Sequence, residues 1–196
     1  MTTNIAPRSV GLVPAANWPL TVWTQARQVT RLLDWPVMAG DEAPPDAFFA
    51  ALRTARREVE AAQFLGVSLP RYEAVAWAAR VLAAYPVSDR ANVEAMRAVH
   101  RWLLEPSDAL RRASLVTTYP IRGATPARLC ATAVFLSGGS TMPAGATPMP
   151  APRHTTGMLA AAAVLAATLK SDRPATDLAE ALDLGAAIAA QATEPL

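Results

Sequence analysis

The spacing of the prolines is the feature that most constrains the fold of this chain. The sequence contains 17 prolines in 196 residues, and proline interrupts both helices and sheets because it lacks an amide hydrogen and fixes φ. Apolar residues between the prolines recur with a helical period, whereas the alternation typical of strands is nearly absent. We therefore predict an all-α single domain of about seven or eight helices. The prolines that separate the helical segments are Pro19, Pro36, Pro45, Pro70, Pro86, Pro106, Pro120, Pro126, Pro152 and Pro174.

The composition predicts a folded chain with an alanine-rich core. Hydrophobic residues make up 52% of the sequence and charged residues 17%, which is the opposite of the balance in disordered chains. Much of the apolar content is alanine, whose side chain buries little area. We therefore expect a core that depends on close approach between helices.

Residues 46–65 show the clearest helical pattern. Five apolar side chains fall on one stripe with alternating spacings of four and three residues: Phe48, Leu52, Ala55, Val59 and Ala62. This spacing predicts one amphipathic helix, and Gly66 is a plausible residue for its end.

The remaining helices are predicted from apolar periodicity and from capping residues. Residues 71–85 are apolar on almost every side, which indicates a central, buried helix. Further helices are expected over about 89–105, 107–118, 127–136, 154–169 and 175–191. Hydroxyl side chains precede several of these segments and are predicted N-caps: Ser88, Ser107, Thr125, and either Thr155 or Thr156.

Three tryptophans mark the beginning of the chain. We divide the sequence into an N-terminal extension with a first helix, residues 1–45, and a helical domain, residues 46–196, which we expect to form one folded unit. Trp18, Trp23 and Trp35 lie in the extension and need burial somewhere. They either dock on the helices of this chain or bind another protein.

Residues 138–153 form the one long interior segment without a helical pattern. They contain four prolines, three glycines, Met142 and Met149, and residues 129–152 carry no charged side chain. A long uncharged loop is either packed against its own domain or covered by a partner. The two methionines are therefore candidate partner-binding residues.

Charge, cysteine content and hydropathy argue against several classes of protein. The net charge is only +2, and basic residues form no strong single-sign field, so nucleic acid is not an expected partner. The single cysteine excludes a disulfide framework within the chain. The longest late apolar run, residues 157–169, is shorter than the roughly 20 residues of a membrane span. We expect a cytoplasmic protein without a membrane span, metal site or cofactor.

The candidate catalytic side chains each have a simpler structural interpretation. Cys130 could act as a nucleophile if the fold brought a histidine close to it. A cysteine in an apolar helix is more often a core residue. His100 and His154 are the only histidines; His100 is expected to be half-buried, and a metal-binding pattern is absent. Residues 137–140, Ser-Gly-Gly-Ser, follow a predicted helix rather than opening one. We interpret them as a cap and turn, not a phosphate-binding loop.

Arg111 and Arg112 lie on a predicted short helix, near other arginines. They could form a basic face for an acidic partner. The alternative, which we favour because charge runs usually lie in solvent, is an exposed helix surface.

Three stretches carry a resemblance to a known family. They are residues 69–80, LPRYEAVAWAAR; residues 102–113, WLLEPSDALRRA; and residues 126–140, PARLCATAVFLSGGS, continuing to HTTG at 154–157. Together they resemble a bacterial family of helical proteins, a domain of unknown function, over about residues 69–168. The resemblance implies an association with type VI secretion genes and assigns no catalytic residue.

These observations predict a non-enzymatic adaptor or chaperone that binds another protein, such as a secretion component or effector; a homo-oligomer is also compatible with them. Two alternatives remain open. One is a hydrolase or transferase that uses Cys130 or Ser137 with a histidine, and the other is a carrier of a hydrophobic ligand.

Overall fold

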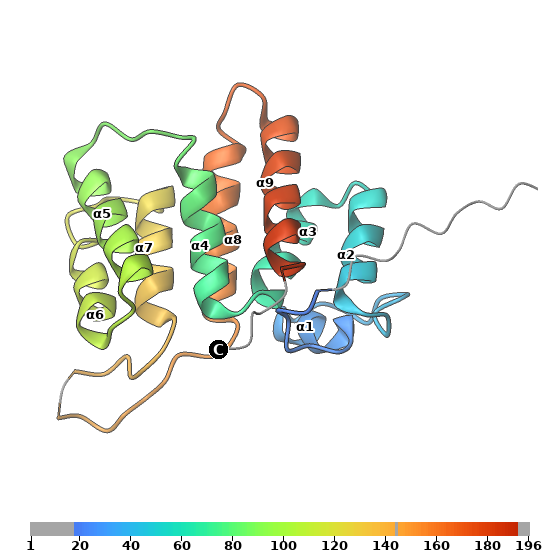
Figure 1. Ribbon diagram of the computed structural model, residues 1–196, viewed down its shortest axis with the longest axis horizontal. Helices are drawn as coiled ribbons and strands as arrows, with labels where there is room; N and C mark the ends of the chain where they lie inside the picture. Colours follow the sequence, from blue (N-terminus) through green and yellow to red (C-terminus); the bar gives the residue numbers. More distant parts are fainter. Residues whose placement is uncertain (1–17, 144, 192–196) are drawn as a thin grey trace, which may run out of the picture.

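The computed structural model describes residues 18–143 and 145–191, and within these ranges the chain forms nine α-helices and no β-strand. Figure 1 shows α5, α6 and α7 at one end, α4 and α8 in the middle, and α9, α3, α2 and α1 at the other end. The all-α prediction is confirmed, but the described residues hold nine helices rather than seven or eight. The helices are α1 (Ala26–Leu32), α2 (Pro45–Thr54), α3 (Glu58–Ser68), α4 (Arg71–Leu82), α5 (Arg90–Leu104), α6 (Asp108–Val116), α7 (Pro126–Leu136), α8 (Thr155–Thr168) and α9 (Pro174–Ala189).

The prediction of one helix over residues 46–65 is wrong, because the chain turns between α2 and α3. Arg56 adopts a left-handed φ of 56°, and the amide of Arg57 donates to the carbonyl of Leu52 (2.9 Å). The turn breaks the apolar stripe, so that Ala55 and Val59 are exposed although they belong to it. No glycine or proline marks this turn in the sequence.

Gly66 lies inside α3 and does not end the helix, contrary to the prediction. It faces Gly157 of α8, and a Cβ atom built on either glycine would overlap the backbone of the other. The two helices therefore cross in backbone contact. α3 continues for two further residues and ends at Ser68, whose hydroxyl donates to the carbonyl of Phe64 (2.8 Å).

α8 is the central helix of the array and packs against α3, α4, α7 and α9. Most of its buried residues are small: Thr156, Gly157, Ala160, Ala161, Ala163, Val164, Ala167 and Thr168. Because an alanine side chain ends at Cβ, the neighbouring helices come close to the axis of α8. The core is rich in alanine, as predicted.

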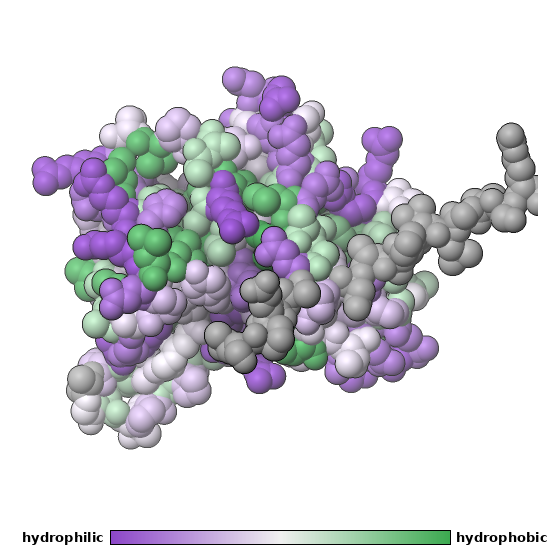
Figure 2. All heavy atoms as spheres, viewed as in Figure 1, coloured by the Kyte–Doolittle hydropathy of each residue, from purple (hydrophilic) through white to green (hydrophobic). Residues whose placement is uncertain are grey.

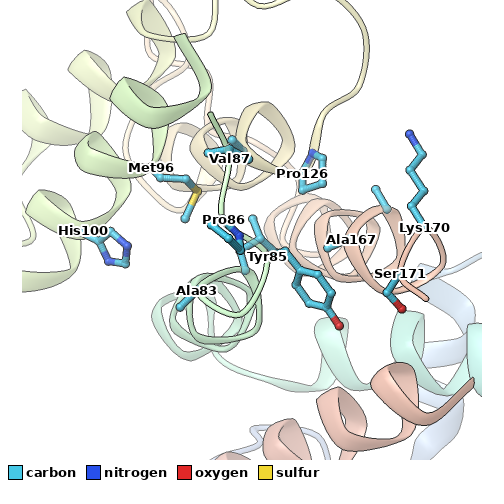
Figure 3. A pocket seen from close by; sticks show the side chains of 13 residues that line it. Ala83, Tyr85, Pro86, Val87, Met96, His100, Pro126, Ala167, Lys170 and Ser171 are labelled. Atoms are coloured by element: carbon cyan, nitrogen blue, oxygen red, sulfur yellow. The ribbon is translucent and has the colours of Figure 1, made fainter. Parts of the chain in front are cut away.

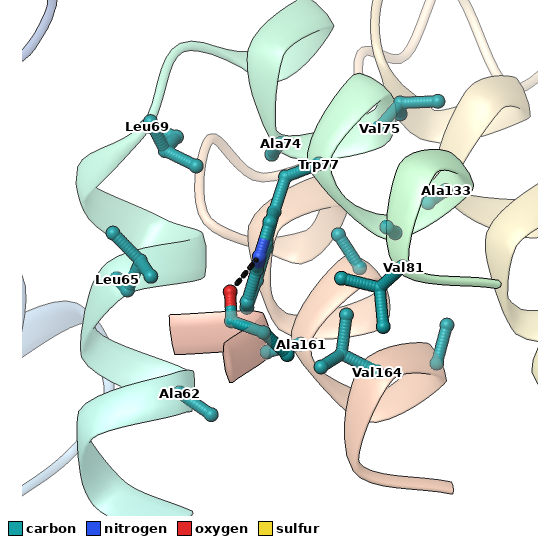
Figure 4. Close-up of a cluster of buried hydrophobic side chains, with 14 of the residues drawn as sticks. Ala62, Leu65, Leu69, Ala74, Val75, Trp77, Val81, Ala133, Ala161 and Val164 are labelled. Atoms are coloured by element: carbon teal, nitrogen blue, oxygen red, sulfur yellow. Dashed lines mark hydrogen bonds between the residues drawn. The ribbon is translucent and has the colours of Figure 1, made fainter. Parts of the chain in front are cut away.

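Trp77 on α4 is the largest of the fully buried side chains in the described part of the chain. Its side chain is fully buried, and its indole Nε1 donates to the carbonyl of Ala181 on α9 (2.7 Å; Figure 4). Gly185 on α9 leaves room for the ring, since a Cβ there would lie 2.8 Å from Nε1. The buried α4 agrees with its sequence pattern, which is apolar on almost every side.

Two of the predicted N-caps are confirmed and two are wrong. Ser107 and Thr125 accept backbone hydrogen bonds at the starts of α6 and α7. α5 is capped by Asp89, whose carboxylate accepts from the amide of Asn92 (3.0 Å), and not by Ser88. α8 begins after His154 without a side-chain cap, so the threonines at its start do not cap it.

The segment before α1 packs on the helical body. Trp18 is buried against Phe49 of α2, with ring centroids 5.1 Å apart. Trp23 is partly buried, and its indole donates to the carbonyl of Val67 (3.1 Å). Trp35 is also partly buried against the core. All three tryptophans therefore contact the chain's own helices, which was one of the two predicted alternatives.

Among the described residues, none of the helices has both the length and the apolar character that crossing a bilayer requires.

Candidate functional site

The connection between α7 and α8 projects from the helical body as a long loop (Figure 1). We call residues 140–150 the arm. A single antiparallel bridge joins Ser140 to Pro150, and the amide of Thr141 donates to the carbonyl of Met149 (2.8 Å). The predicted loop 138–153 is therefore not irregular throughout, because residues 140 and 141 pair with residues 150 and 149.

The tip of the arm lies in solvent. Residues 143 and 145–150 are exposed, and the side chain of Met149 is 56% exposed. In Figure 2 the arm forms a lobe in pale colours, between the hydrophilic and hydrophobic ends of the scale. The described residues of the tip are therefore not packed against the body, and whether a partner covers them stays a prediction.

The base of the arm is held by two neighbouring arginines of α6, which we call the arginine clamp (Arg111 and Arg112). The guanidinium of Arg111 donates to the carbonyl of Ser140 (3.0 Å) and also to that of Phe135. Arg112 donates to the carbonyls of Ser140 (3.1 Å) and Met142 (3.0 Å). Hydrogen bonds from a charged donor are stronger than neutral ones, so the clamp fixes the position of the arm.

One carboxylate orients both arginines of the clamp. Asp108 Oδ1 accepts from Arg111 (2.6 Å), and Oδ2 accepts from Arg112 Nε (2.8 Å). These hydrogen bonds, first that of Arg111, hold the pKa of Asp108 below its usual value. Arg111 also lies over the ring of Phe135, with its Cζ 5.1 Å from the centroid. Its guanidinium is therefore bounded by a carboxylate, carbonyls and an aromatic face.

Gly139 gives the arginine clamp its access to the arm. It has a left-handed φ of 57°, and a Cβ atom there would lie 2.9 Å from Arg111 Nη2. The prediction that residues 137–140 form a cap and turn is confirmed, since Ser137 is the C-cap of α7. Its hydroxyl donates to the carbonyl of Val134 (2.7 Å).

The preferred interpretation of the two arginines as an exposed surface is wrong for Arg111, which is only 3% exposed. Sequence reasoning missed the role of the pair in holding the arm. The signal was Asp108, which lies three and four residues before the arginines, together with the later segment 129–152, which has no charged side chain of its own. Whether the arginines or Met142 also bind a partner stays a prediction.

The candidate catalytic residues are not brought together by hydrogen bonds in the described part of the chain. Cys130 is fully buried in α7, and burial raises the pKa of its thiol to about 12. His100 is exposed on α5, not half-buried as expected, and His154 is half-buried before α8. Within the described ranges, no group of three or more histidine, cysteine or acidic side chains is arranged to hold a metal ion.

A second feature is an apolar cleft where α4 and α8 end, beside the start of α7 and the middle of α5 (Figure 3). We call it the helix-end cleft. Its volume is about 400 Å³, and its lining comes from four separated segments: residues 82–83 with 85–87, Met96 with His100, Pro126 with Ala127, and residues 166–167 with 170–171. The sequence analysis did not find this cleft, because no single segment contains its pattern.

The comparisons with known proteins place the chain in a family. A family model described as a family of unknown function, DUF6931, matches residues 48–189, which is more than half of the chain. The matched region extends from α2 to the end of α9 and includes the arginine clamp and the arm. The comparisons with curated proteins and with solved structures give no match. The resemblance to a family of unknown function is thereby confirmed, whereas its bacterial origin and its association with type VI secretion stay predictions. The chain belongs to the DUF6931 family.

Proposed function

We propose that this protein is a non-enzymatic interaction module that binds a partner protein through the arm. The observation that carries the proposal is the contrast between the two ends of the arm. Its base is fixed by charged hydrogen bonds from the arginine clamp, whereas its tip is exposed and contributes nothing to the core.

The composition of the arm suits a docking element. It contains prolines at 143, 148 and 150 and no charged residue. Proline restricts the backbone before binding, so less conformational freedom is lost when a partner orders the tip. A tip without charge also avoids the desolvation of ionised groups in an interface.

The contact chemistry of the arm predicts the kind of surface it meets. Met149 offers a flexible apolar side chain, and methionine adapts to irregular surfaces. We expect an apolar recess on the partner that takes Met149, surrounded by groups that bond to exposed carbonyls of the tip. A bacterial type VI secretion component or effector in the cytoplasm is the partner class that the family resemblance favours.

The enzyme alternative has less support from the site. The thiol of Cys130 is buried, and its raised pKa opposes the thiolate that a nucleophile needs. The hydroxyl of Ser137 is engaged by the backbone of its own helix.

The test compares two substitutions that add one negative charge each. Met149→Asp places the charge on the arm, and Val37→Asp places it on a side chain that is 94% exposed between α1 and α2. Affinity capture from the native host, with a photo-reactive residue at position 149 for cross-linking, identifies the partner.

We expect the partner captured by the wild-type chain to be lost with Met149→Asp and retained with Val37→Asp. Circular dichroism should show both variants folded, because both positions are exposed. Equal capture by the two variants, or a partner that never cross-links to position 149, would contradict binding through the arm.

A further inference from the structure

The helix-end cleft is separate from the arm. The two features lie at opposite ends of α7, since Pro126 lines the cleft and the arm follows Ser137. An α-helix rises about 1.5 Å per residue, so the length of α7 keeps them roughly 15 Å or more apart. A ligand in the cleft would therefore not contact the clamp or the arm.

The cleft is hollow because small side chains lie where larger ones would fill it. Ala127 of α7 and Ala167 of α8 are buried and line it. Ala83 and Ala166 line it as well, while the wall is completed by bulkier apolar residues: Leu82, Pro86, Val87 and Met96. The volume of about 400 Å³ falls in the range of small-molecule sites, about 300–1,000 Å³.

Two hydroxyl groups at the edge are already engaged by the protein. Hydrogen bonding of Ser171 and of Tyr85 lowers the pKa of Asp177 on α9, and Figure 3 shows these two hydroxyls on the same side of the cleft. The pKa of Tyr85 is raised, first by burial and then by Asp177. The hydroxyl of Ser171 also donates to the carbonyl of Thr168 (2.8 Å), so its proton is not available to a ligand.

The remaining polar groups on the lining favour an anionic head group. Lys170 is the one charged residue among those that line the cleft, His100 stands on the opposite side, and no carboxylate belongs to the lining. Figure 3 shows the Lys170 side chain extended outward. Its flexible four-carbon stem lets the ammonium group follow a ligand at the rim.

We propose that the helix-end cleft binds a medium-chain fatty acid, with the alkyl chain against the alanines that line the cleft and the carboxylate at Lys170. The alkyl chain would cover apolar surface that otherwise faces water, at about 25 cal/mol per Å². The carboxylate would stay at the rim, where it keeps part of its hydration and needs no buried partner.

The first test measures binding of dodecanoate to the purified full chain by isothermal titration calorimetry, below the micelle concentration. Ala166→Leu fills the cleft from a half-buried position on α8, and Ala162→Leu adds the same volume one turn earlier, outside the lining. We expect saturable binding at one dodecanoate per chain, a loss of at least about tenfold in Ala166→Leu, and wild-type affinity in Ala162→Leu. Absence of saturable binding, or equal affinities in the two variants, would overturn the proposal.

The second test concerns the head group. Lys170→Gln should weaken dodecanoate binding about two- to fivefold, as expected for one exposed charge pair, while Arg122→Gln removes an equal charge away from the cleft and should leave it unchanged. Dodecyltrimethylammonium carries the same chain with a positive head and should bind more weakly than dodecanoate. If the cationic probe binds as tightly, the cleft does not select a carboxylate and the proposed ligand class is wrong.

Discussion

The side chain of Arg111 makes three kinds of interaction. It bonds to a carboxylate within its own helix, bonds to carbonyls 24 and 29 residues further along the chain, and lies over an aromatic ring. Its neighbour Arg112 shares the same carboxylate, but 35% of its side chain is exposed. The pair therefore allows a comparison between a buried arginine and a partly exposed one that both hold the base of the arm.

Substitution of Arg111 by methionine should destabilise the protein by about 2–4 kcal/mol, because the buried carbonyl of Phe135 loses its charged donor and the carbonyl of Ser140 keeps only Arg112. Arg112→Met should cost less than about 1 kcal/mol, since water replaces its bonds. Urea unfolding followed by circular dichroism measures both, and limited proteolysis reports release of the arm. Similar losses in the two variants would show that the buried guanidinium has no special role.

Glycine lies at two of the close contacts between helices in this array. The crossing of α3 and α8 has a glycine on each side, and the contact of α9 with Trp77 also has a glycine. Glycine is unfavourable inside a helix by about 1 kcal/mol relative to alanine. Its presence at Gly66 and Gly157 is explained by the backbone contact, which no larger residue permits.

Gly66→Ala should destabilise the protein by about 1–3 kcal/mol although alanine favours the helix, because the new methyl group forces α3 and α8 apart. Gly138→Ala is the matched control, since a Cβ there meets no atom within 4 Å. We expect its free energy of unfolding to stay within about 0.5 kcal/mol of the wild type. Thermal and urea unfolding give the comparison, and a stabilised Gly66→Ala protein would be inconsistent with the close crossing.

The free energy of unfolding of the whole molecule should depend on the thiol of Cys130 at alkaline pH. Its pKa is raised by burial from 9.0 to about 12. Below pH 9 the thiol is neutral in the folded and unfolded states. Between pH 9 and 12 only the unfolded chain releases this proton, so stability falls by up to about 1.4 kcal/mol per pH unit.

Urea unfolding at pH 8, 9 and 10 of the wild type and of Cys130→Ala isolates this contribution. The difference in stability between the two proteins should shift with pH in favour of Cys130→Ala. The raised pKa of Tyr85 acts in both proteins and cancels in the difference. Parallel curves would mean that the thiol ionises equally in both states.

At the scale of the molecule, the positions of the helices could be predicted from the sequence better than the contacts between them. Periodicity and prolines located the buried α4 and the caps Ser107 and Thr125, because these depend on neighbours in the chain. The turn at Arg56 was missed because no glycine or proline marks it and because a contact beside it is tertiary: Arg53 pairs with Asp183 of α9 (2.9 Å). Local patterns carry no information about such partners.

The candidate site follows the same division. The sequence alone showed that the arm is uncharged and rich in proline, and that it contains two methionines. The arginine clamp was not, since it joins α6 to carbonyls beyond α7. The helix-end cleft was also out of reach, because its lining converges only after α4, α5, α7 and α8 pack.

The alanine-rich packing around α8 has a consequence for how the native state is selected. Alanine has no rotatable side-chain bond beyond its methyl group, so ordering it freezes no rotamers. A leucine-filled interior can repack in several rotamer combinations, whereas the contacts of Ala160, Ala161 and Ala163 allow only one arrangement at a given helix spacing. Order in this interior is therefore set by the positions of the helix backbones, and loss of one close crossing should loosen the array as a unit.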